Sequence, residues 1–195
     1  MTRENTAKRK RQLRQELRQL RRDLSSRQQL WAGRALRDRL LCQSRFQHSR
    51  HIACYLPADG EIDTRPLIHA ALAAGKQLYL PVIEGNRMQF HPYSRGTRLY
   101  LSGFGLLEPR AGRQAIAELT LDLVIMPLVG FDRSGARLGM GGGFYDRAFQ
   151  QVQKRAPKPF LLGVAHGLQE LDEVPVEYWD RCLHAVATDG DYFNI

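Results

Sequence analysis

The chain has 195 residues, of which 43% are hydrophobic and 25% charged, as in a soluble globular protein with its own core. No apolar run approaches the ~20 residues of a membrane span, and the basic N-terminus lacks the apolar stretch of a secretory signal. The cysteines, Cys42, Cys54 and Cys182, are widely spaced without metal-site pairing, which suits a reducing cytoplasm. We therefore expect a cytoplasmic protein with one domain over residues 1–195.

The net charge of +9 is concentrated in the N-terminal segment. Residues 1–50 contain 15 Lys or Arg and 4 Asp or Glu, whereas the rest of the chain contains 14 and 16. Leucines recur at helical spacing in this segment, namely at Leu13, Leu17, Leu20 and Leu24. We expect this stripe to pack residues 1–50 against the body as helices, with the arginines mostly solvated. Nucleic-acid binding is the less favoured alternative, because no aromatic platform or zinc-finger spacing accompanies the charge.

Hydrophobic periodicity predicts alternating helices and strands. Helices are expected at about residues 6–23, 26–41, 64–74 and 144–152. Strands are expected at 52–56, 77–82, 88–93, 123–128, 160–165 and 185–188, with a loop-rich stretch over 94–112. A capping box from Ser25 or Ser26 to Gln28 or Gln29 opens the second helix. The third helix is capped by Asp63 or Thr64.

This alternation predicts a three-layer α/β fold, with a largely parallel sheet, helices on both faces and an N-terminal helical pair. Ligands of such sheets bind at the carboxyl ends of the strands. We expect three loops to converge there, namely residues 59–64, the glycine-rich loop at 131–146 and the loop after Ala165. His166 in the last of these loops is expected to be a turn or core histidine.

The glycine-rich loop is the most informative feature of the sequence. It lies between a strand and a helix and contains five glycines, at positions 135, 139, 141, 142 and 143. Backbone N–H groups in such a loop, together with a helix N-terminus, bind phosphate. The loop is neither a Walker A motif, because no Gly-Lys-Ser/Thr follows, nor a Rossmann fingerprint, because Phe144 replaces the last glycine. Tight packing is the structural alternative, but five glycines exceed the needs of one turn.

Residues 137–146, Arg-Leu-Gly-Met-Gly-Gly-Gly-Phe-Tyr-Asp, preceded by Phe131-Asp132 and Gly135, resemble the signature of the 5-formyltetrahydrofolate cyclo-ligase family. Weaker similarities follow in the family's order, at Lys10-Arg11-Gln12-Leu13-Arg14, Glu61-Ile62-Asp63-Thr64, Glu108-Pro109 and the segment from Pro175 to Asp180. The resemblance implies a NagB/RpiA/CoA-transferase-like fold. It also implies MgATP-dependent cyclisation of 5-formyltetrahydrofolate to 5,10-methenyltetrahydrofolate, with release of ADP and phosphate, through an iminium phosphate.

The resemblance implies roles for individual residues. Those matched to ATP binding are Lys10, Arg11, Arg14, Arg137, Gly139, Met140, Gly141, Gly142, Gly143, Phe144 and Tyr145. Those matched to folate binding are Leu56, Glu61, Gly142, Gly143, Phe144 and Tyr145. Arg137 and Tyr145 are the catalytic candidates, and Asp146 and Asp180 the candidate Mg²⁺ ligands.

Some roles have structural alternatives. Arg137 could bridge the loop to the scaffold, Glu61 could be a solvent-facing loop acid, and Asp180 could be an ordinary surface residue. Many members of the family carry basic residues where this chain has Met140 and Gly142. We therefore expect backbone amides, Mg²⁺ and the first helix to carry more of the phosphate binding here.

Two other functions remain open from the sequence. One is another phosphate-ester enzyme, such as a sugar-phosphate isomerase or a small-molecule kinase. The other is a nucleic-acid-binding protein that uses the basic N-terminus. For the favoured function, the expected partners are 5-formyltetrahydrofolate and ATP, with no membrane, and the expected state is a monomer.

Overall fold

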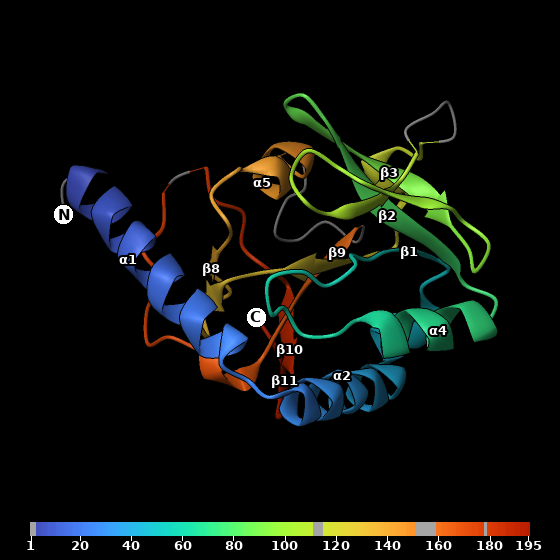
Figure 1. Ribbon diagram of the computed structural model, residues 1–195, viewed down its shortest axis with the longest axis horizontal. Helices are drawn as coiled ribbons and strands as arrows, with labels where there is room; N and C mark the ends of the chain where they lie inside the picture. The colour runs from blue at the N-terminus through green and yellow to red at the C-terminus, as the bar shows by residue number, and fades with distance from the viewer. Residues whose placement is uncertain (1–2, 111–114, 151–158, 178) are drawn as a thin grey trace.

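A computed structural model describes residues 3–110, 115–150, 159–177 and 179–195 around a seven-stranded sheet (Figure 1). Its strands, in spatial order, are β11 (Tyr192–Asn194), β10 (Ala185–Thr188), β9 (Phe160–Ala165), β6 (Leu123–Pro127), β1 (His51–Ala53), β2 (Gln77–Glu84) and β3 (Arg87–Tyr93). The five inner strands are parallel, and the edge strands β3 and β11 pair antiparallel. The predicted largely parallel sheet is therefore confirmed.

Helical segments cover both faces of the sheet. The α-helices are α1 (Arg3–Arg22), α2 (Ser26–Leu41), α3 (Ser44–His48), α4 (Arg65–Ala73) and α5 (Phe144–Ala148). Successive strand residues point to opposite faces, so in β6 Ile125 joins the core beneath α2 and α4, whereas Val124 and Met126 join the core beneath α5. Figure 1 shows α2 and α4 side by side on one face, with α1 running along one side of the molecule. No described helix is long and apolar enough to cross a membrane.

The buried face of α1 differs from the predicted leucine stripe. Leu13 and Leu17 are buried as expected, but Leu20 is 51% exposed, and Arg21 is completely buried instead. The buried positions follow i, i+4, i+8 spacing, which keeps one face of the helix against the body. Arg21 can occupy this face because its guanidinium is paired there, as described below.

Both predicted helix starts are found, but their side chains act differently. The capping box joins Ser25 to Gln28, whose side chain accepts the Ser25 N–H at 2.9 Å. At the start of α4, Asp63 Oδ1 accepts the N–H of Arg65 at 2.9 Å. Thr64 makes no such cap, because its hydroxyl donates to the Tyr55 carbonyl at 2.6 Å.

Replacing Thr64 tests this buried hydrogen bond. Thr64→Val is expected to lower the free energy of unfolding by about 1 kcal/mol, because the Tyr55 carbonyl loses its hydroxyl donor while the side-chain volume is retained. Urea unfolding followed by circular dichroism measures the change. Thr120→Val is the matched control, because Thr120 bonds the Ala117 carbonyl in an exposed turn. An equal loss in both variants would contradict the importance of burial.

Three element boundaries are corrected by the structure. The first strand ends at Ala53 instead of residue 56, because the Tyr55 carbonyl bonds to Thr64 rather than to a neighbouring strand. The loop-rich stretch contains a hairpin of β4 (Leu99–Leu101) and β5 (Leu107–Pro109), for which the glycines interpreted as loop signals supply the turn. The helix after the glycine loop, α5, ends at Ala148, and position 152 lies outside the described residues.

Three further side chains belong to the two cores. Met88 and Phe90 are buried beneath the α5 face, and Cys54 is buried beneath the α2 face. All three cysteines are free thiols. Other short elements that the sequence did not reveal are η1 (Glu118–Thr120), η2 (Gly167–Gln169) and the edge strand β11.

Candidate functional site

The first half of the glycine-rich loop is a structural hairpin, formed by β7 (Gly130–Phe131) and β8 (Arg137–Leu138). Buried Asp132 closes its turn, because its Oδ1 accepts the N–H groups of Ser134 at 2.9 Å and Ala136 at 3.2 Å. A Cβ on Gly135 would lie 2.9 Å from the Ile195 side chain. Packing therefore explains Gly135, in agreement with the structural alternative.

The second half of the loop, residues 139–143, is open to solvent. Gly141 and Gly143 adopt positive φ angles of 103° and 64°, which side chains rarely tolerate. Gly139 has no positive φ, and no described atom lies within 4 Å of the place that a Cβ on it would take. Because α5 has only five residues, the loop amides are a stronger anion-binding feature than the helix dipole.

Helix α1 meets this open segment directly. Arg14 Nε donates to the Gly139 carbonyl at 2.8 Å, and its guanidinium carbon lies 3.5 Å from the position of a Cβ on Gly141. One turn earlier, Lys10 Nζ pairs with Asp180 Oδ2 at 2.6 Å. Burial lowers the pKa of Arg14, and the charge of Asp180 opposes this shift. Lys10 and Arg14 therefore share one face beside the loop, whereas Arg11 is exposed and makes no described contact with it.

The two candidate metal ligands lie next to each other through the backbone at Arg181. Asp146 Oδ1 accepts the N–H of Arg181 at 3.0 Å, and Asp180 is the preceding residue. Asp180 is held by Lys10 and by the N–H of Glu177 at 2.9 Å, so it is not an ordinary surface residue. The structure thus brings both carboxylates to the side of the loop that contacts α1.

Arg137 connects the loop to this carboxylate pair. It is 8% exposed, and its Nη2 donates to Asp146 Oδ1 at 2.6 Å while its Nη1 donates to the Arg181 carbonyl. These contacts support the bridging role that we considered for Arg137. Its guanidinium orients Asp146 in the structure.

Glu61 is largely buried rather than solvent-facing, with a side-chain exposure of 12%. Its Oε2 accepts the N–H of Ala58 at 3.1 Å. Burial raises the pKa of Glu61 to about 7, although the charge of Arg21 opposes that shift. The solvent-facing alternative for Glu61 is therefore wrong, and a carboxyl with a raised pKa in a loop at the sheet edge is typical of a functional site.

The three predicted loops converge. Arg21 joins the 59–64 loop to the glycine loop, because its Nη2 donates to Asp59 Oδ2 at 2.9 Å and lies 4.0 Å from the Met140 sulfur. His166 Nε2 lies 3.3 Å from the Gly60 carbonyl, so the loop after Ala165 joins them. His166 is 2% exposed, which confirms the expected core histidine. Leu56 packs on the α2 side of the core, and Phe144 and Tyr145 pack on the α5 side.

Sequence reasoning missed the cluster that holds the 59–64 loop. Asp59 bonds three arginines of α1, through Arg18 Nε at 2.7 Å, Arg21 Nη2 at 2.9 Å and Arg22. Although burial opposes it, these hydrogen bonds lower the pKa of Asp59 to about 2. The one signal in the sequence is the spacing, because Arg21 continues the i, i+4 series of Leu13 and Leu17, whereas Arg18 and Arg22 do not.

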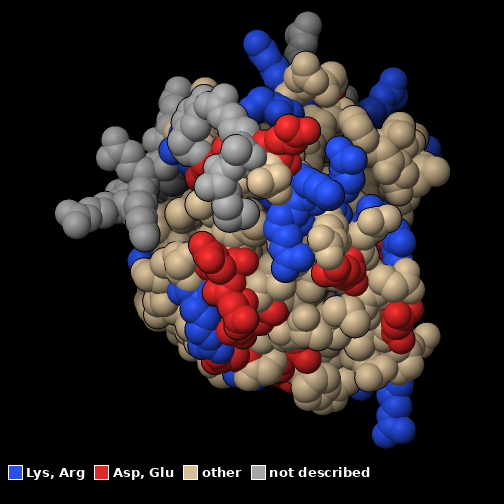
Figure 2. Space-filling model, turned by 90° about the vertical axis from the view of Figure 1, so that its left-hand side faces the viewer, with Lys and Arg blue, Asp and Glu red and all other residues tan. Residues whose placement is uncertain are grey.

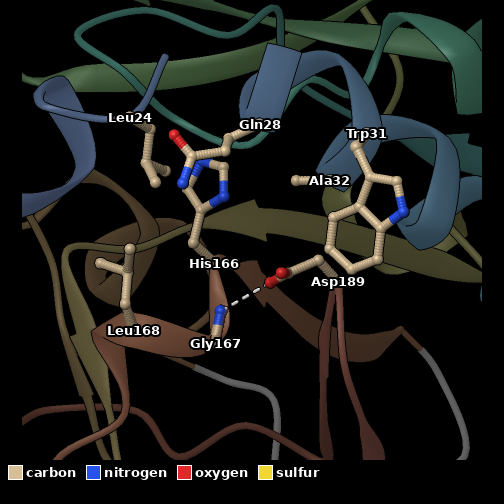
Figure 3. Close-up of a pocket in the computed structure, with 8 residues that line it drawn as sticks. All are labelled: Leu24, Gln28, Trp31, Ala32, His166, Gly167, Leu168 and Asp189. Carbon is tan, nitrogen blue, oxygen red and sulfur yellow. Dashed lines mark hydrogen bonds between the residues drawn. The ribbon is translucent and has the colours of Figure 1, made fainter. Parts of the chain in front are cut away.

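A separate cavity of about 250 Å³ lies behind this loop (Figure 3). It is lined by Leu24, Gln28, Trp31, Ala32, His166, Gly167, Leu168 and Asp189, none of which is a predicted site residue. In Figure 3 the Asp189 carboxylate points to Gly167, whose N–H it accepts at 2.7 Å. Because none of the predicted site residues lines this cavity, we place the candidate site at the glycine loop instead.

The surface on the side of α1 carries charges of both signs. Figure 2 shows basic and acidic side chains interspersed there, rather than one uniformly basic face. Part of the basic segment is neutralised by the ion pairs of Lys10, Arg18, Arg21 and Arg22 described above.

Comparison with known proteins shows which family this chain resembles. Residues 6–189 match the model of the 5-formyltetrahydrofolate cyclo-ligase family. The 5-formyltetrahydrofolate cyclo-ligase of Escherichia coli K12 is 39% identical over 183 residues, covering 88% of this chain and 96% of the relative. The Haemophilus influenzae enzyme of that name is 36% identical, covering 90% and 95%.

Comparison with solved structures points to the same family. The NMR structure of Aquifex aeolicus 5,10-methenyltetrahydrofolate synthetase is 30% identical to the chain and superposes with a TM-score of 0.81, covering 95% of this chain and 92% of that one. The Mycoplasma pneumoniae synthetase shares the fold at 22% identity, with a TM-score of 0.72. In this chain the glycine loop is joined to a basic first helix. The family model and the relatives show that the chain is a member of the 5-formyltetrahydrofolate cyclo-ligase family.

Proposed function

We propose that this chain catalyses the ATP-dependent cyclisation of 5-formyltetrahydrofolate to 5,10-methenyltetrahydrofolate, with release of ADP and phosphate. The observation that carries the proposal is the contact of Arg14 with the Gly139 carbonyl at 2.8 Å, which joins the basic helix to the glycine loop. Family membership supplies the substrate class. As further proposals, the protein is a cytoplasmic monomer with one domain over residues 1–195.

The reaction proceeds through activation of the formyl oxygen. An amide-like formyl group is a poor electrophile, so its oxygen first attacks the γ-phosphorus of ATP and the bond to ADP breaks. The neighbouring folate nitrogen then attacks the formyl carbon and loses its proton, and the C–O bond breaks to release phosphate. Such a sequence requires alignment of two substrates and neutralisation of phosphoryl charge, rather than a general base.

The residues beside the loop supply this alignment for ATP. Backbone N–H groups of residues 139–144 face the phosphates, and Lys10 and Arg14 add charge-assisted hydrogen bonds. Met140 and Gly142 contribute backbone only. Arg137 acts by orienting Asp146, to which it is bonded at 2.6 Å.

Asp146 and Asp180 fit a magnesium ion that is shared with the nucleotide. Mg²⁺ takes one or two protein carboxylates and completes its coordination with phosphate oxygens and water. The described residues contain no group of three or more His, Cys, Asp or Glu that could hold a metal alone. The hydrogen bonds that Asp146 and Asp180 make with described residues involve one oxygen of each carboxylate, Oδ1 of Asp146 and Oδ2 of Asp180. When bound, Mg²⁺ supplies positive charge at the transferred phosphoryl group.

Folate binding is assigned to the neighbouring loop and to the start of α5. An ionised Glu61 can accept paired hydrogen bonds from the amino and ring N–H groups of the pterin. Leu56, on the α2 side of the core, and Phe144 and Tyr145, on the α5 side, offer apolar surface to the folate. Tyr145 is the catalytic candidate that reaches the folate side, because its phenol lies in the field of Glu61.

One assay tests the proposed function. The protein mixed with 5-formyltetrahydrofolate and MgATP is expected to produce the near-ultraviolet absorbance of the methenyl product, together with one ADP for each product. Omitting ATP should abolish both signals. Absence of the methenyl signal, or turnover of a sugar phosphate without ATP, would overturn the proposal.

Gly139→Ala tests the phosphate cradle. The added methyl group has room in the free protein, but it would occupy the space of a ligand on the loop. We expect the KM for ATP to rise about tenfold with little change in thermal stability. Gly96→Ala is the matched control, because Gly96 also has open space around a Cβ and lies on a distant turn. A KM for ATP that stays at the wild-type value in Gly139→Ala would remove this glycine from the site.

A further inference from the structure

Arg21 is a completely buried cation whose nitrogens all contact the loops of the candidate site. Its Nε donates to the Asp59 carbonyl at 2.8 Å, its Nη2 to Asp59 Oδ2 at 2.9 Å and its Nη1 to the Leu128 carbonyl at 3.3 Å. A buried charge is tolerated only with such a complete set of partners. Arg21 therefore ties the end of α1 to the 59–64 loop and to the end of β6.

The loop that Arg21 holds has an unusual backbone. Asp59 has a φ of 52°, and Gly60 has a φ of 74°. A non-glycine residue at positive φ persists only where surrounding contacts fix it. Three arginines hold the Asp59 carboxylate, and a Cβ on Gly60 would lie 2.9 Å from the Arg21 carbonyl. Because Glu61 follows directly, this anchoring fixes where its side chain begins.

Arg21 also acts on the Glu61 carboxylate through space, because its Nη2 lies 3.8 Å from Glu61 Oε1. Burial raises the pKa of Glu61 to about 7, and among the opposing influences the charge of Arg21 is the largest. The Ala58 N–H and Arg18 also lower this pKa, whereas Asp59 raises it. The phenols that face Glu61 are those of Tyr55 and Tyr145. Without Arg21, a larger fraction of Glu61 would be protonated at neutral pH, and that fraction would lose acceptor capacity.

We propose that Arg21 is a positioning residue for folate binding, which fixes the 59–61 loop and favours the ionised Glu61 carboxylate for the substrate. This inference rests on the folate-binding role proposed for Glu61. Arg21 does not touch the substrate in this role. It acts through the 59–61 loop and Glu61. Its Nη2 also lies 4.0 Å from the Met140 sulfur of the glycine loop, and it shares α1 with the ATP-binding residues Lys10 and Arg14, so the test compares both substrates.

Because Arg21 lies on the same helix as Lys10 and Arg14, a comparison of the two KM values shows whether its effect is specific for folate. Arg21→Met is expected to raise the KM for 5-formyltetrahydrofolate at least about tenfold at pH 7, with the KM for ATP within about twofold of wild type. Raising the pH should recover part of the loss, because Glu61 ionises at higher pH in this variant. Arg21→Lys, which retains the charge, should recover part of it at pH 7. Arg37→Met, in an exposed pair with Asp38, controls for loss of an arginine.

Two outcomes would overturn the inference. An equal rise in both KM values would show that Arg21 only packs α1, and an unchanged KM for folate would show no role at Glu61. If Arg21→Met does not fold, Arg21→Gln carries the comparison, because it keeps hydrogen-bonding groups without the charge, and a merely structural role would leave the pH dependence of its folate KM like that of wild type.

A measurement without turnover separates this inference from the proposed function. Carbon-13 NMR of glutamate-labelled protein reports the titration of Glu61, assigned by the signal lost in Glu61→Gln. We expect the Glu61 titration to move to higher pH in Arg21→Met, and to remain closer to wild type in Arg21→Lys. An unmoved titration overturns the inference even if the enzyme is active. An inactive wild-type protein overturns the proposed function, while the titration still tests the hold of Arg21 on Glu61.

Discussion

Glu61→Gln is expected to raise the KM for 5-formyltetrahydrofolate by up to about a hundredfold, with the KM for ATP close to wild type. The amide removes the charge and replaces one acceptor oxygen by a donor, so the paired hydrogen bonds to the pterin cannot both form. Steady-state kinetics with each substrate varied in turn gives both constants. Burial of Glu61, with a side-chain exposure of 12%, makes the charge-assisted contribution large.

The pH dependence of Glu61→Gln gives a second readout. In the wild type, folate binding should strengthen as the pH rises through about 7, because Glu61 ionises there. The free energy of unfolding should change in the opposite direction and fall as the pH rises. The folded pKa lies above the unfolded value of 4.5, so the contribution of protonated Glu61 is complete below pH 4.5 and is lost as the pH rises through about 7. Both dependences should disappear in Glu61→Gln, as measured by kinetics and by urea unfolding across this range.

Asp63→Asn is the matched control for Glu61→Gln. Asp63 lies two residues away in the same loop, but its carboxylate pairs with Arg65 at 2.8 Å and 3.0 Å. We expect its KM for folate to stay within about threefold of wild type. A similar loss in both variants would assign the effect to the loop as a whole and contradict the role of Glu61.

The double substitution of Lys10 and Arg14 by alanine is expected to raise the KM for ATP by about a hundredfold or more, with a smaller effect on folate. Among the described residues, Arg14 forms a hydrogen bond through Nε only, which leaves its terminal nitrogens for phosphate. Residues 138–146 of the loop contain no Lys or Arg, so α1 supplies the cationic side chains beside the open segment. The two single variants measure how the loss divides.

Point substitutions in α1 are more informative than removal of the helix. Removing the whole first helix would also remove Leu13, Leu17 and Arg21, which are buried, so lost activity would not distinguish binding from folding. Arg9→Ala is the control, because Arg9 is exposed on the same helix. A KM for ATP that rises as much in Arg9→Ala would mean that the general charge of α1 attracts ATP, and would contradict specific contacts from Lys10 and Arg14.

Particular elements show why part of this protein could be predicted. The strands at 77–82, 123–128, 160–165 and 185–188 are found within two residues of the expected bounds, because apolar periodicity is a local property that a buried sheet requires. The capping box at Ser25 depends on a spacing of three residues. In contrast, the β4–β5 hairpin was missed because its strands have only three residues each and its glycine-rich turn looked like loop.

The sequence by itself determined the parallel α/β sheet, the convergence of its loops and the family signature, because these depend on periodicity and short motifs. Only the tertiary structure decided which charges matter. It buried Arg21 and left Leu20 exposed, and it raised the pKa of Glu61 by burial. It also joined Lys10 to Asp180 and Arg14 to Gly139, across more than one hundred residues of chain. Burial and charge pairing depend on neighbours distant in sequence, which no local pattern can specify.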